Sequence, residues 1–213
     1  MTTKPKILNL YSGIGGTIHK LNDYSNITNV DNNKIVLEIN KRLHPGSTNI
    51  LCDAKEYLIK NYRNFDIILA SPPCQPNTRL NYTLNSQNIV RLPDLSIYEI
   101  VLFLEQFHKG LYMVENVISY FEPLIKPQIL DRHFVWSNVK FKNIDMPNKF
   151  NLSSSNIKYL ENSLGINLGK TKGLGKRKDQ ILRNCIHPGL GVQIIEQLNQ
   201  AFDNRNFIQN KLF

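Results

Sequence analysis

The segment Ser71-Pro72-Pro73-Cys74-Gln75 carries the strongest chemical signal in this sequence. Its two prolines stiffen the turn that follows an apolar run, so the Cys74 sulfur is expected at the rim of a site. Cys52 and Cys185 are more typical than Cys74 of cysteines that are buried as small hydrophobic side chains. A later apolar run leads to Glu115, and a thiolate paired with such a proton donor can attack an electron-poor ring and protonate it. Without Cys74 nearby, Glu115 would be interpreted as a structural hydrogen-bonding residue.

A glycine-rich loop, Ser12-Gly13-Ile14-Gly15-Gly16, follows the first apolar run. Such a loop lets the backbone approach a nucleotide-like ligand, although a turn that needs positive φ would also use glycines. Asp31 closes the next apolar run and could accept hydrogen bonds from two ribose hydroxyls, or cap the helix that follows it. Asp53 closes a third run and could accept from an adenine amino group or cap its own helix. The loop lacks the ending of an NTP-binding P-loop.

The elements that position these residues alternate along the chain. Apolar runs predict five strands, and amphipathic stretches between them predict helices, which together indicate an α/β fold with a mainly parallel, doubly wound sheet. Ligands of such sheets bind beyond the carboxyl ends of the strands, where all the residues named above as candidates fall. The expected strands cover 7–11, 27–30, 49–52, 65–70 and 110–114, and the expected helices cover 17–22, 34–43, 54–61 and 96–107.

The remaining segments are less regular. A polar, Asn-rich loop is expected over 75–94, and the pattern loosens after Pro123, with one further strand expected over 134–136. A basic region rich in Asn, Ser and Gly then runs to about Lys178 and is expected to be irregular. A helix over 192–202 is expected to pack back on the sheet.

Most of the net positive charge lies in one stretch. The chain has 213 residues with 26 Lys+Arg and 17 Asp+Glu, a net charge of +9. Between Lys126 and Lys178, eleven basic and three acidic residues give +8 of that total. Because Lys and Arg displace counterions from phosphates, this clustering indicates a surface that faces nucleic acid, and a solvated face is the alternative.

Composition excludes several classes of protein. With 41% hydrophobic and 20% charged residues, the chain is typical of one folded domain, with or without a small appendage. No apolar run approaches the roughly 18–20 residues that cross a bilayer, and the N-terminal run is too short for a signal peptide. These features predict a cytoplasmic protein with no membrane partner. Three cysteines, odd in number and far apart, argue against disulfides and against a metal site.

The order of the motifs resembles that of the cytosine-C5 DNA methyltransferases, in particular their compact phage-type members. Three departures stand out: Asn9 replaces the usual acidic residue of the first motif, Arg183 and His187 replace Gly and Pro in a late motif, and Arg132 alone remains of an arginine pair. The matching segments are Asn9–Gly16, Pro72–Gln75, Leu92–Asp94, Glu115–Val117, Arg132–Asn138 and Leu182–Pro188.

The resemblance implies a Rossmann-like S-adenosylmethionine-dependent methyltransferase fold. It implies that the Cys74 thiolate adds to cytosine C6 while Glu115 engages N3, so that C5 attacks the methyl group of S-adenosylmethionine. Asn116 would hold the Glu115 loop, and Arg132, with His133 as the alternative, would contact the cytosine O2. Because the target atom lies inside a stacked duplex, the base must flip out, and the loop over 75–91 would act as a lid.

The resemblance also assigns binding residues and parts of the chain. The expected cofactor-binding residues are Tyr11, Ser12, Gly13, Gly15, Gly16, Asp31, Asn32, Asp53, Ala54, Pro72 and Asn184. The expected nucleic-acid-binding residues are Gln75, Arg79, Lys140, Lys142, Lys172, Lys176 and Arg177. Residues 1–138 would form the catalytic and cofactor-binding domain, 139–178 a short target recognition segment, and 179–213 a C-terminal segment that packs back on the domain.

The expected partner is double-stranded DNA, and the expected protein is a monomer in a prokaryotic or infected host cell, with a separate restriction nuclease as a further candidate partner. Three alternatives stay open. An RNA (tRNA) cytosine-C5 methyltransferase would use the same motifs. A catalytically silent nucleic-acid-binding homologue would fit the reduced arginine motif. A dinucleotide oxidoreductase would explain the glycine loop but neither Cys74 nor Glu115.

Overall fold

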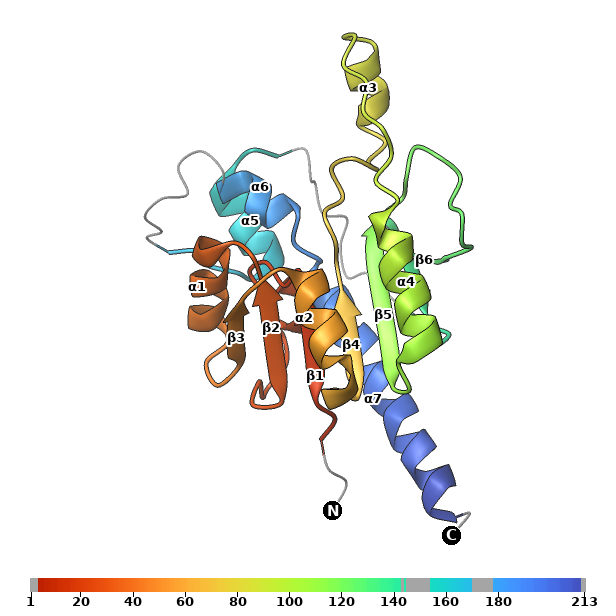
Figure 1. Cartoon of the computed structure of the whole chain (residues 1–213). Helices are drawn as coiled ribbons and strands as arrows, with labels where there is room; N and C mark the ends of the chain where they lie inside the picture. The colour runs from red at the N-terminus through yellow and green to blue at the C-terminus, as the bar shows by residue number, and fades with distance from the viewer. Residues whose placement is uncertain (1–3, 143, 145–153, 170–177, 212–213) are drawn as a thin grey trace.

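A seven-stranded sheet lies at the centre of the computed structural model, which describes residues 4–142, 144, 154–169 and 178–211 (Figure 1). The strand order is β3-β2-β1-β4-β5-β7-β6; β1 to β5 run parallel, and β7 is antiparallel to both of its neighbours. The strands are β1 Ile7–Leu10, β2 Ile27–Asp31, β3 Thr48–Leu51, β4 Ile67–Ala70, β5 Leu111–Val117, β6 Gln128–Leu130 and β7 His133–Ser137.

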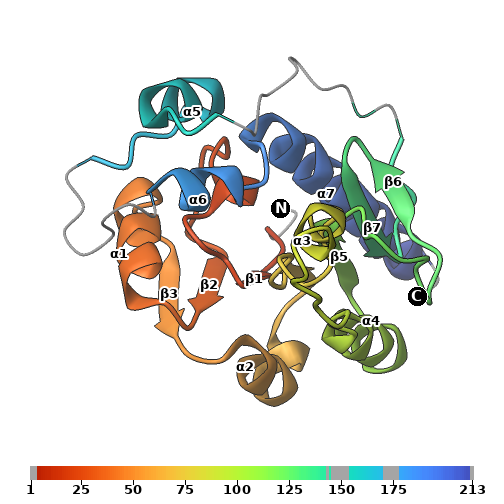
Figure 2. The ribbon, with the colours of Figure 1, turned by 90° about the horizontal axis from the view of Figure 1, so that it is seen from above.

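Helices cover both faces of the sheet, which explains why β1 and β4 are apolar at nearly every position. Figure 2 shows α2 (Ala54–Asn61) and α4 (Ser96–Phe107) on one face, and α7 (Pro188–Lys211) on the other. Each face has its own buried cluster of apolar side chains. The expected α/β class and the mainly parallel sheet are therefore confirmed.

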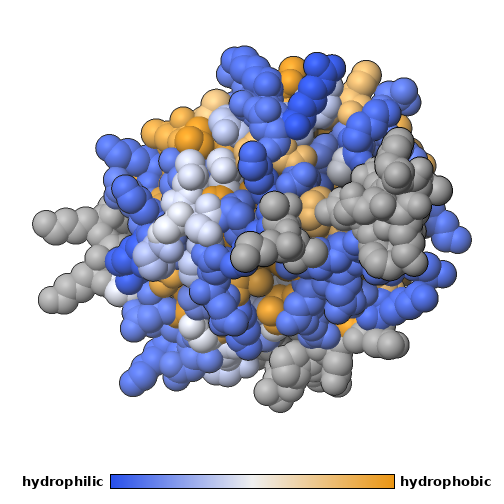
Figure 3. Space-filling model, turned by 90° about the horizontal axis from the view of Figure 1, so that it is seen from below, coloured by the Kyte–Doolittle hydropathy of each residue, from blue (hydrophilic) through white to orange (hydrophobic). Residues whose placement is uncertain are grey.

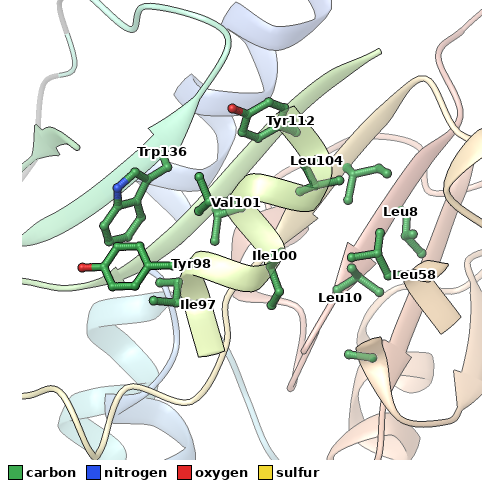
Figure 4. Close-up of a cluster of buried hydrophobic side chains, with 14 of the residues drawn as sticks. Leu8, Leu10, Leu58, Ile97, Tyr98, Ile100, Val101, Leu104, Tyr112 and Trp136 are labelled. Carbon is green, nitrogen blue, oxygen red and sulfur yellow. The ribbon is translucent and has the colours of Figure 1, made fainter. Parts of the chain in front are cut away.

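The cluster under α4 packs aromatic rings against aliphatic side chains (Figure 4). The rings of Tyr98 and Trp136 meet edge to face, with centroids 5.8 Å apart. Their polar atoms stay paired, because Trp136 Nε1 donates to the Ile125 carbonyl and the Leu124 amide donates to the Tyr98 hydroxyl. A large apolar side chain buried in this way contributes about 1.5–3 kcal/mol. This packing fixes α4 against β5 and β7.

Three helices match the sequence-based boundaries: α1 (Lys34–Leu43), α2 and α4. The helix expected over 17–22 was wrong, because the structure has only one 3-10 turn there, η1 (Gly16–Ile18). The N-terminal part of α7 occupies that space: a Cβ on Gly191 would lie 2.2 Å from the Thr17 carbonyl oxygen. The sequence analysis also missed β6 and the short helix α3 (Asn81–Asn85) within the 75–94 loop.

The segment expected to be irregular contains ordered, buried structure. Helix α5 (Ile157–Leu164) lies beside α1, as does α6 (Lys178–Arg183) (Figure 2). These helices pack on Ile14 of the glycine loop and Val36 of α1 and form a third buried apolar cluster. The 154–169 segment contributes Leu160, Leu164, Ile166 and Leu168 to this cluster. That segment is thus part of the folded core.

Figure 3 shows the face at the amino ends of the parallel strands, where hydrophilic residues predominate and hydrophobic ones are scattered among them. Among the described residues, no helix is both long enough and apolar enough to cross a membrane.

Candidate active site

A cavity of about 520 Å³ lies at the carboxyl ends of the parallel strands, a size typical of small-molecule sites. Side chains from the glycine loop, from three strand ends and from the segment before α7 line it. Of the residues expected from sequence, the lining includes Tyr11, Ser12, Gly13, Gly16, Asp31, Asn32, Pro72, Cys74, Gln75, Glu115, Arg132 and Asn184.

Cys74 lies in the turn after β4, and its carbonyl accepts from the amides of Asn77 and Thr78. Burial raises the pKa of its thiol to about 11; the negative charge of Glu115 raises it further, whereas Arg132 lowers it. In the free protein the thiol is therefore neutral at pH 7.

Glu115 lies inside β5 rather than at its end, because pairing with β7 extends the strand to Val117. Its side chain is fully buried, which raises its pKa to about 7, while a hydrogen bond with Ser71 and the charge of Arg132 lower it. His133 Nε2 lies 3.6 Å from Glu115 Oε1. Near neutral pH the Glu115 side chain can therefore hold a proton that it can donate.

Asn116 does not line the cavity, but it holds the turn that carries Cys74. Its Nδ2 donates to the Pro72 carbonyl at 3.0 Å, and its Oδ1 accepts from the Val117 amide at 3.1 Å. The first bond ties β5 to the stiff Pro72-Pro73-Cys74 turn, and the second, within β5, orients the Asn116 amide. The strand that carries Glu115 is thereby held to the turn that carries Cys74.

Arg132 is brought to the cavity by a two-residue turn between β6 and β7. Its neighbour Asp131 has a φ of 54°, in the left-handed region that tight hairpin turns use. Arg132 is half-buried, and its charge acts on both Cys74 and Glu115. The cavity therefore places a thiol, a carboxylic acid and a guanidinium together.

The glycine loop forms another part of the cavity lining. Gly13 has a φ of 50°, and a Cβ there would meet nothing within 4 Å, so the loop leaves open space next to its backbone. The Gly13 amide donates to Asp31 Oδ2 at 2.8 Å. The hydroxyl of Ser12 is buried and has no hydrogen-bond partner among the described residues. Burial also raises the pKa of Tyr11 to about 12, which keeps its hydroxyl neutral.

These features fit a nucleoside-like cofactor. Asp31 Oδ1 already accepts from the Asn33 amide at 2.8 Å, so each carboxylate oxygen has one bond and can accept another from a hydroxyl. The Ser12 hydroxyl can donate a hydrogen bond to a ligand, and the open space at Gly13 leaves room for the ligand to approach the backbone. The donor set is thus that of a site for a ribose and its polar substituents.

Several expected site residues lie outside the cavity lining: Gly15, Asp53, Ala54, Asn116, Arg79, Lys140 and Lys142. Asp53 caps α2, accepting from the amides of Lys55 and Glu56. Gly15 instead packs on His44, where an added Cβ would come within 2.5 Å of the ring. Lys172, Lys176 and Arg177 lie outside the described residues.

Lys140 and Lys142 are directed away from the cavity by the antiparallel strand β7. Its carboxyl end points toward the amino ends of the parallel strands, and Asn138 Nδ2 donates to the Gly110 carbonyl just before β5. The Lys142 amide then donates to Gln197 Oε1 on α7. The sequence analysis did not foresee this reversal of direction.

The sequence analysis also missed two residues at the site. Ser71 bonds Glu115, and its place before Pro72 was the available signal. Cys185 lines the cavity and is buried, which raises its pKa to about 12 and makes it inert. A Cβ on Gly16 would lie 2.0 Å from the Cys185 sulfur, so Gly16 permits this contact.

Comparison with protein families gives a match to the C-5 cytosine-specific DNA methylase family over residues 5–117, more than half of the chain. The match covers β1 to β5 and includes Cys74 and Glu115. The chain therefore belongs to the C-5 cytosine-specific DNA methylase family.

The fold is shared with a solved methyltransferase structure. The methyltransferase EhMeth of Entamoeba histolytica aligns with a TM-score of 0.56 and 14% identity, covering 94% of this chain and 99% of that one. DNMT2 of Spodoptera frugiperda is 30% identical over 52% of this chain, with a TM-score of 0.35, and only 35% of that chain is covered. No curated protein sequence matches this chain.

Family membership establishes the reaction at the coarse level. The chain is a methyltransferase that acts on C5 of cytosine, and its cofactor is S-adenosylmethionine. The fold expected from sequence, a Rossmann-like methyltransferase fold, is confirmed.

Proposed function

We propose that this protein methylates C5 of cytosine in double-stranded DNA through a covalent adduct between Cys74 and cytosine C6, with the base flipped out of the duplex. The observation that carries the proposal is the shared cavity: Cys74, Glu115 and Arg132 line it together with the glycine loop and Asp31. Such an arrangement puts a nucleophile and an acid beside a cofactor site.

The residues that would hold S-adenosylmethionine are those of the glycine loop and the neighbouring strand ends. Asp31 would accept from the ribose hydroxyls, and Ser12 and Gly13 would contact the polar groups of the cofactor. When bound, S-adenosylmethionine supplies an electrophilic methyl group. Pro72 and Asn184, which line the same cavity, would complete the pocket.

Each catalytic side chain has one task in the proposed mechanism. After the Cys74 thiol has lost its proton to water, the thiolate adds to C6 while Glu115 gives its proton to N3, and the electron pair released by this addition makes C5 nucleophilic. Arg132 would contact the cytosine O2 and stabilise the negative charge that develops on the ring. Loss of the C5 proton then expels Cys74 as a thiolate, and N3 returns its proton to Glu115, which restores the aromatic ring.

The pKa values of Cys74 and Glu115 favour this sequence of events. A negative charge on Glu115 raises the pKa of Cys74, and protonation of Glu115 removes that charge. The protonation state in which Glu115 can donate to N3 is therefore also the state in which the Cys74 thiolate forms more readily. Arg132 favours the thiolate in both states.

The arrangement around the cavity supports a polymeric substrate. The segment after Cys74 rises above the carboxyl ends of the strands and carries α3 (Figure 1), as expected of a lid over a flipped base. Arg79 on this segment is exposed and would contact phosphate. We also propose that the basic 139–178 region, apart from Lys140 and Lys142, contributes to target recognition, with residues 1–138 as the catalytic part and 179–213 as the segment that completes the core.

The decisive experiment is transfer of labelled methyl from S-adenosylmethionine to unmethylated duplex DNA and, separately, to bulk tRNA. The products are then digested and analysed by nucleoside mass spectrometry. We expect 5-methylcytosine in DNA. Label confined to tRNA would keep the mechanism and overturn the DNA assignment, whereas label in neither polymer would favour a catalytically silent nucleic-acid-binding protein.

A further inference from the structure

Arg183 lines the cavity, and the proposed reaction gives it no task. It is the last residue of α6, which lies beside α1 on the carboxyl side of the sheet (Figure 1, Figure 2). In the late motif of the family a glycine takes this place, so family membership does not explain the long, charged side chain.

The guanidinium of Arg183 is only partly paired. Its Nη2 donates to Asp179 Oδ2 at 2.6 Å, one turn earlier on the same helix. Its Nε is buried and has no hydrogen-bond partner among the described residues, although 37% of the whole side chain is exposed. A buried donor without an acceptor costs free energy, so the conformation that Asp179 holds leaves one favourable bond unmade. A small turn of this half-exposed side chain toward an acceptor in the cavity would make that bond.

The charges around the cavity leave one role open for this cation. Among the described residues that line the cavity, only Arg132 and Arg183 carry a lasting positive charge, because burial lowers the pKa of His133 to about 4. The charge of Arg132 acts on Cys74 and Glu115, where the proposed mechanism uses it. Arg183 is therefore the cation that remains for an anionic group of the cofactor.

The segment that carries Arg183 is fixed on the glycine loop. A Cβ on Gly16 would lie 2.0 Å from the Cys185 sulfur, so the two backbones pass close to each other there. Leu182 belongs to the same buried cluster as Ile14 of the loop. Contacts on both sides of Arg183 thus hold it at the part of the cavity that the glycine loop lines.

The chemistry of S-adenosylmethionine matches this placement. The proposed site puts the ribose at Asp31, and the methyl group must face the ring that Cys74 attacks. The amino acid part branches from the same sulfur atom, so it is directed neither to Asp31 nor to Cys74. Its carboxylate needs a donor, and a guanidinium forms strong, charge-assisted hydrogen bonds with a carboxylate.

We propose that Arg183 binds the carboxylate of the amino acid part of the cofactor and thereby makes the site prefer the complete cofactor to a nucleoside that lacks this part. The proposal rests on the proposed cofactor site at the glycine loop. Because a guanidinium has five N–H donors, Arg183 can hold Asp179 and a second carboxylate at the same time.

Two ligands that differ in the amino acid part test the proposal without turnover. S-adenosylhomocysteine has the carboxylate, whereas 5′-methylthioadenosine keeps the adenine, the ribose and the sulfur but lacks the amino acid part. Arg183→Gln should raise the Kd of S-adenosylhomocysteine about ten- to thirtyfold and change the Kd of 5′-methylthioadenosine by less than about twofold. Arg183→Lys, which keeps the charge, should recover most of the loss. Isothermal titration calorimetry would measure each Kd.

Two further variants separate binding by Arg183 from a structural role of its ion pair. Asp179→Asn should lower the Kd of S-adenosylhomocysteine about two- to threefold, because it removes a negative charge beside the ligand carboxylate and keeps the cation. Lys41→Gln, an exposed change on α1 outside the cavity lining, should follow the wild type. A rise in Kd for Asp179→Asn as large as that for Arg183→Gln would overturn the proposal.

The same titrations distinguish failure of this inference from failure of the proposed cofactor site. An equal change for the two ligands in Arg183→Gln, or no change for either, would overturn the role of Arg183 while the wild type still binds both. A wild type that binds neither ligand would overturn the cofactor site itself and the role of Arg183 with it.

Discussion

At the scale of single residues, burial determines the protonation states of the groups at the site. Glu115 is buried and Cys74 is half-buried, so the neutral form of each is favoured and the pKa of each is raised. Arg132 offsets this effect on both groups. The result is a carboxyl group that can hold a proton near pH 7 and a cysteine that is a neutral thiol in the free protein.

Replacing the nucleophile tests the covalent step. Cys74→Ser should abolish methyl transfer, because a serine hydroxyl ionises far less readily than a thiol, while the Kd of S-adenosylmethionine stays within about twofold. Labelled methyl transfer and calorimetry would measure the two quantities. Substantial turnover by this variant would contradict the proposed adduct.

Removing the charge of Glu115 tests the electrostatic link between the two groups. Between about pH 8 and pH 11, where Glu115 is ionised, the alkylation rate of Cys74 by iodoacetamide should rise about tenfold per pH unit, because only the thiolate reacts. Glu115→Gln should lower the pKa of Cys74 and speed alkylation at pH 8 by about three- to tenfold, while it abolishes methyl transfer.

Peptide mass spectrometry would separate Cys74 from Cys52 in this experiment, and Glu122→Gln, an exposed change outside the cavity lining, should leave the rate unchanged. Slower or unchanged alkylation of Glu115→Gln would show that the carboxylate does not act on the sulfur.

At the scale of elements, α7 decides the local structure of the segment after the glycine loop. Its N-terminal turn packs on η1 at Gly191, and the residues before it pack on Gly16 through Cys185. These contacts leave no room for the longer helix that residues 17–22 would otherwise form. Both glycines are needed because a backbone passes close to each.

Gly191→Ala should therefore reduce the free energy of unfolding by about 1–3 kcal/mol, despite the higher helix propensity of alanine. The new Cβ would lie 2.2 Å from the Thr17 carbonyl oxygen, which is backbone and cannot move aside cheaply. Urea denaturation would measure the change. Glu196→Ala, at an exposed position of the same helix, should stay within about 0.5 kcal/mol of the wild type. Equal stability of the two variants would refute this account of η1.

At the scale of the whole molecule, the two edges of the sheet differ. The carboxyl edge carries the cavity and the α3 segment, whereas Lys140 follows β7 from the opposite edge. A basic residue can therefore add to the net charge of +9 and still lie far from the cavity.

Arg79→Gln should weaken binding of duplex DNA several-fold and reduce the slope of log Kd against log salt by about one, because Arg79 lies on the segment above the cavity. The double variant Lys140→Gln, Lys142→Gln should change the Kd by less than about twofold, since charges beyond a Debye length are screened. Fluorescence anisotropy over a salt series would measure both. A larger loss in the double variant would place the DNA on the other edge.

The sequence by itself determined the local pattern. Apolar runs ending in polar residues predicted all five parallel strands, and because carboxyl ends of parallel strands meet at one edge, they placed Asp31, Cys74 and Glu115 near one another. The matching boundaries of α1 and α2 have the same origin, since helix periodicity and the Asn33 and Asp53 caps are encoded within a few residues of the helix start, whereas α4 has no side-chain cap and follows from periodicity alone.

Only the tertiary structure decided the features that depend on contacts between distant segments. The direction of β7 and the position of Arg132 follow from a two-residue turn, and three-residue β6 is too short to leave a pattern. The loss of the helix over 17–22 depends on α7, and the burial of the 154–169 segment depends on α1. The contact between the imidazoles of His19 and His44 joins residues 25 positions apart. Periodicity within a window cannot encode such contacts, because their partners lie outside it.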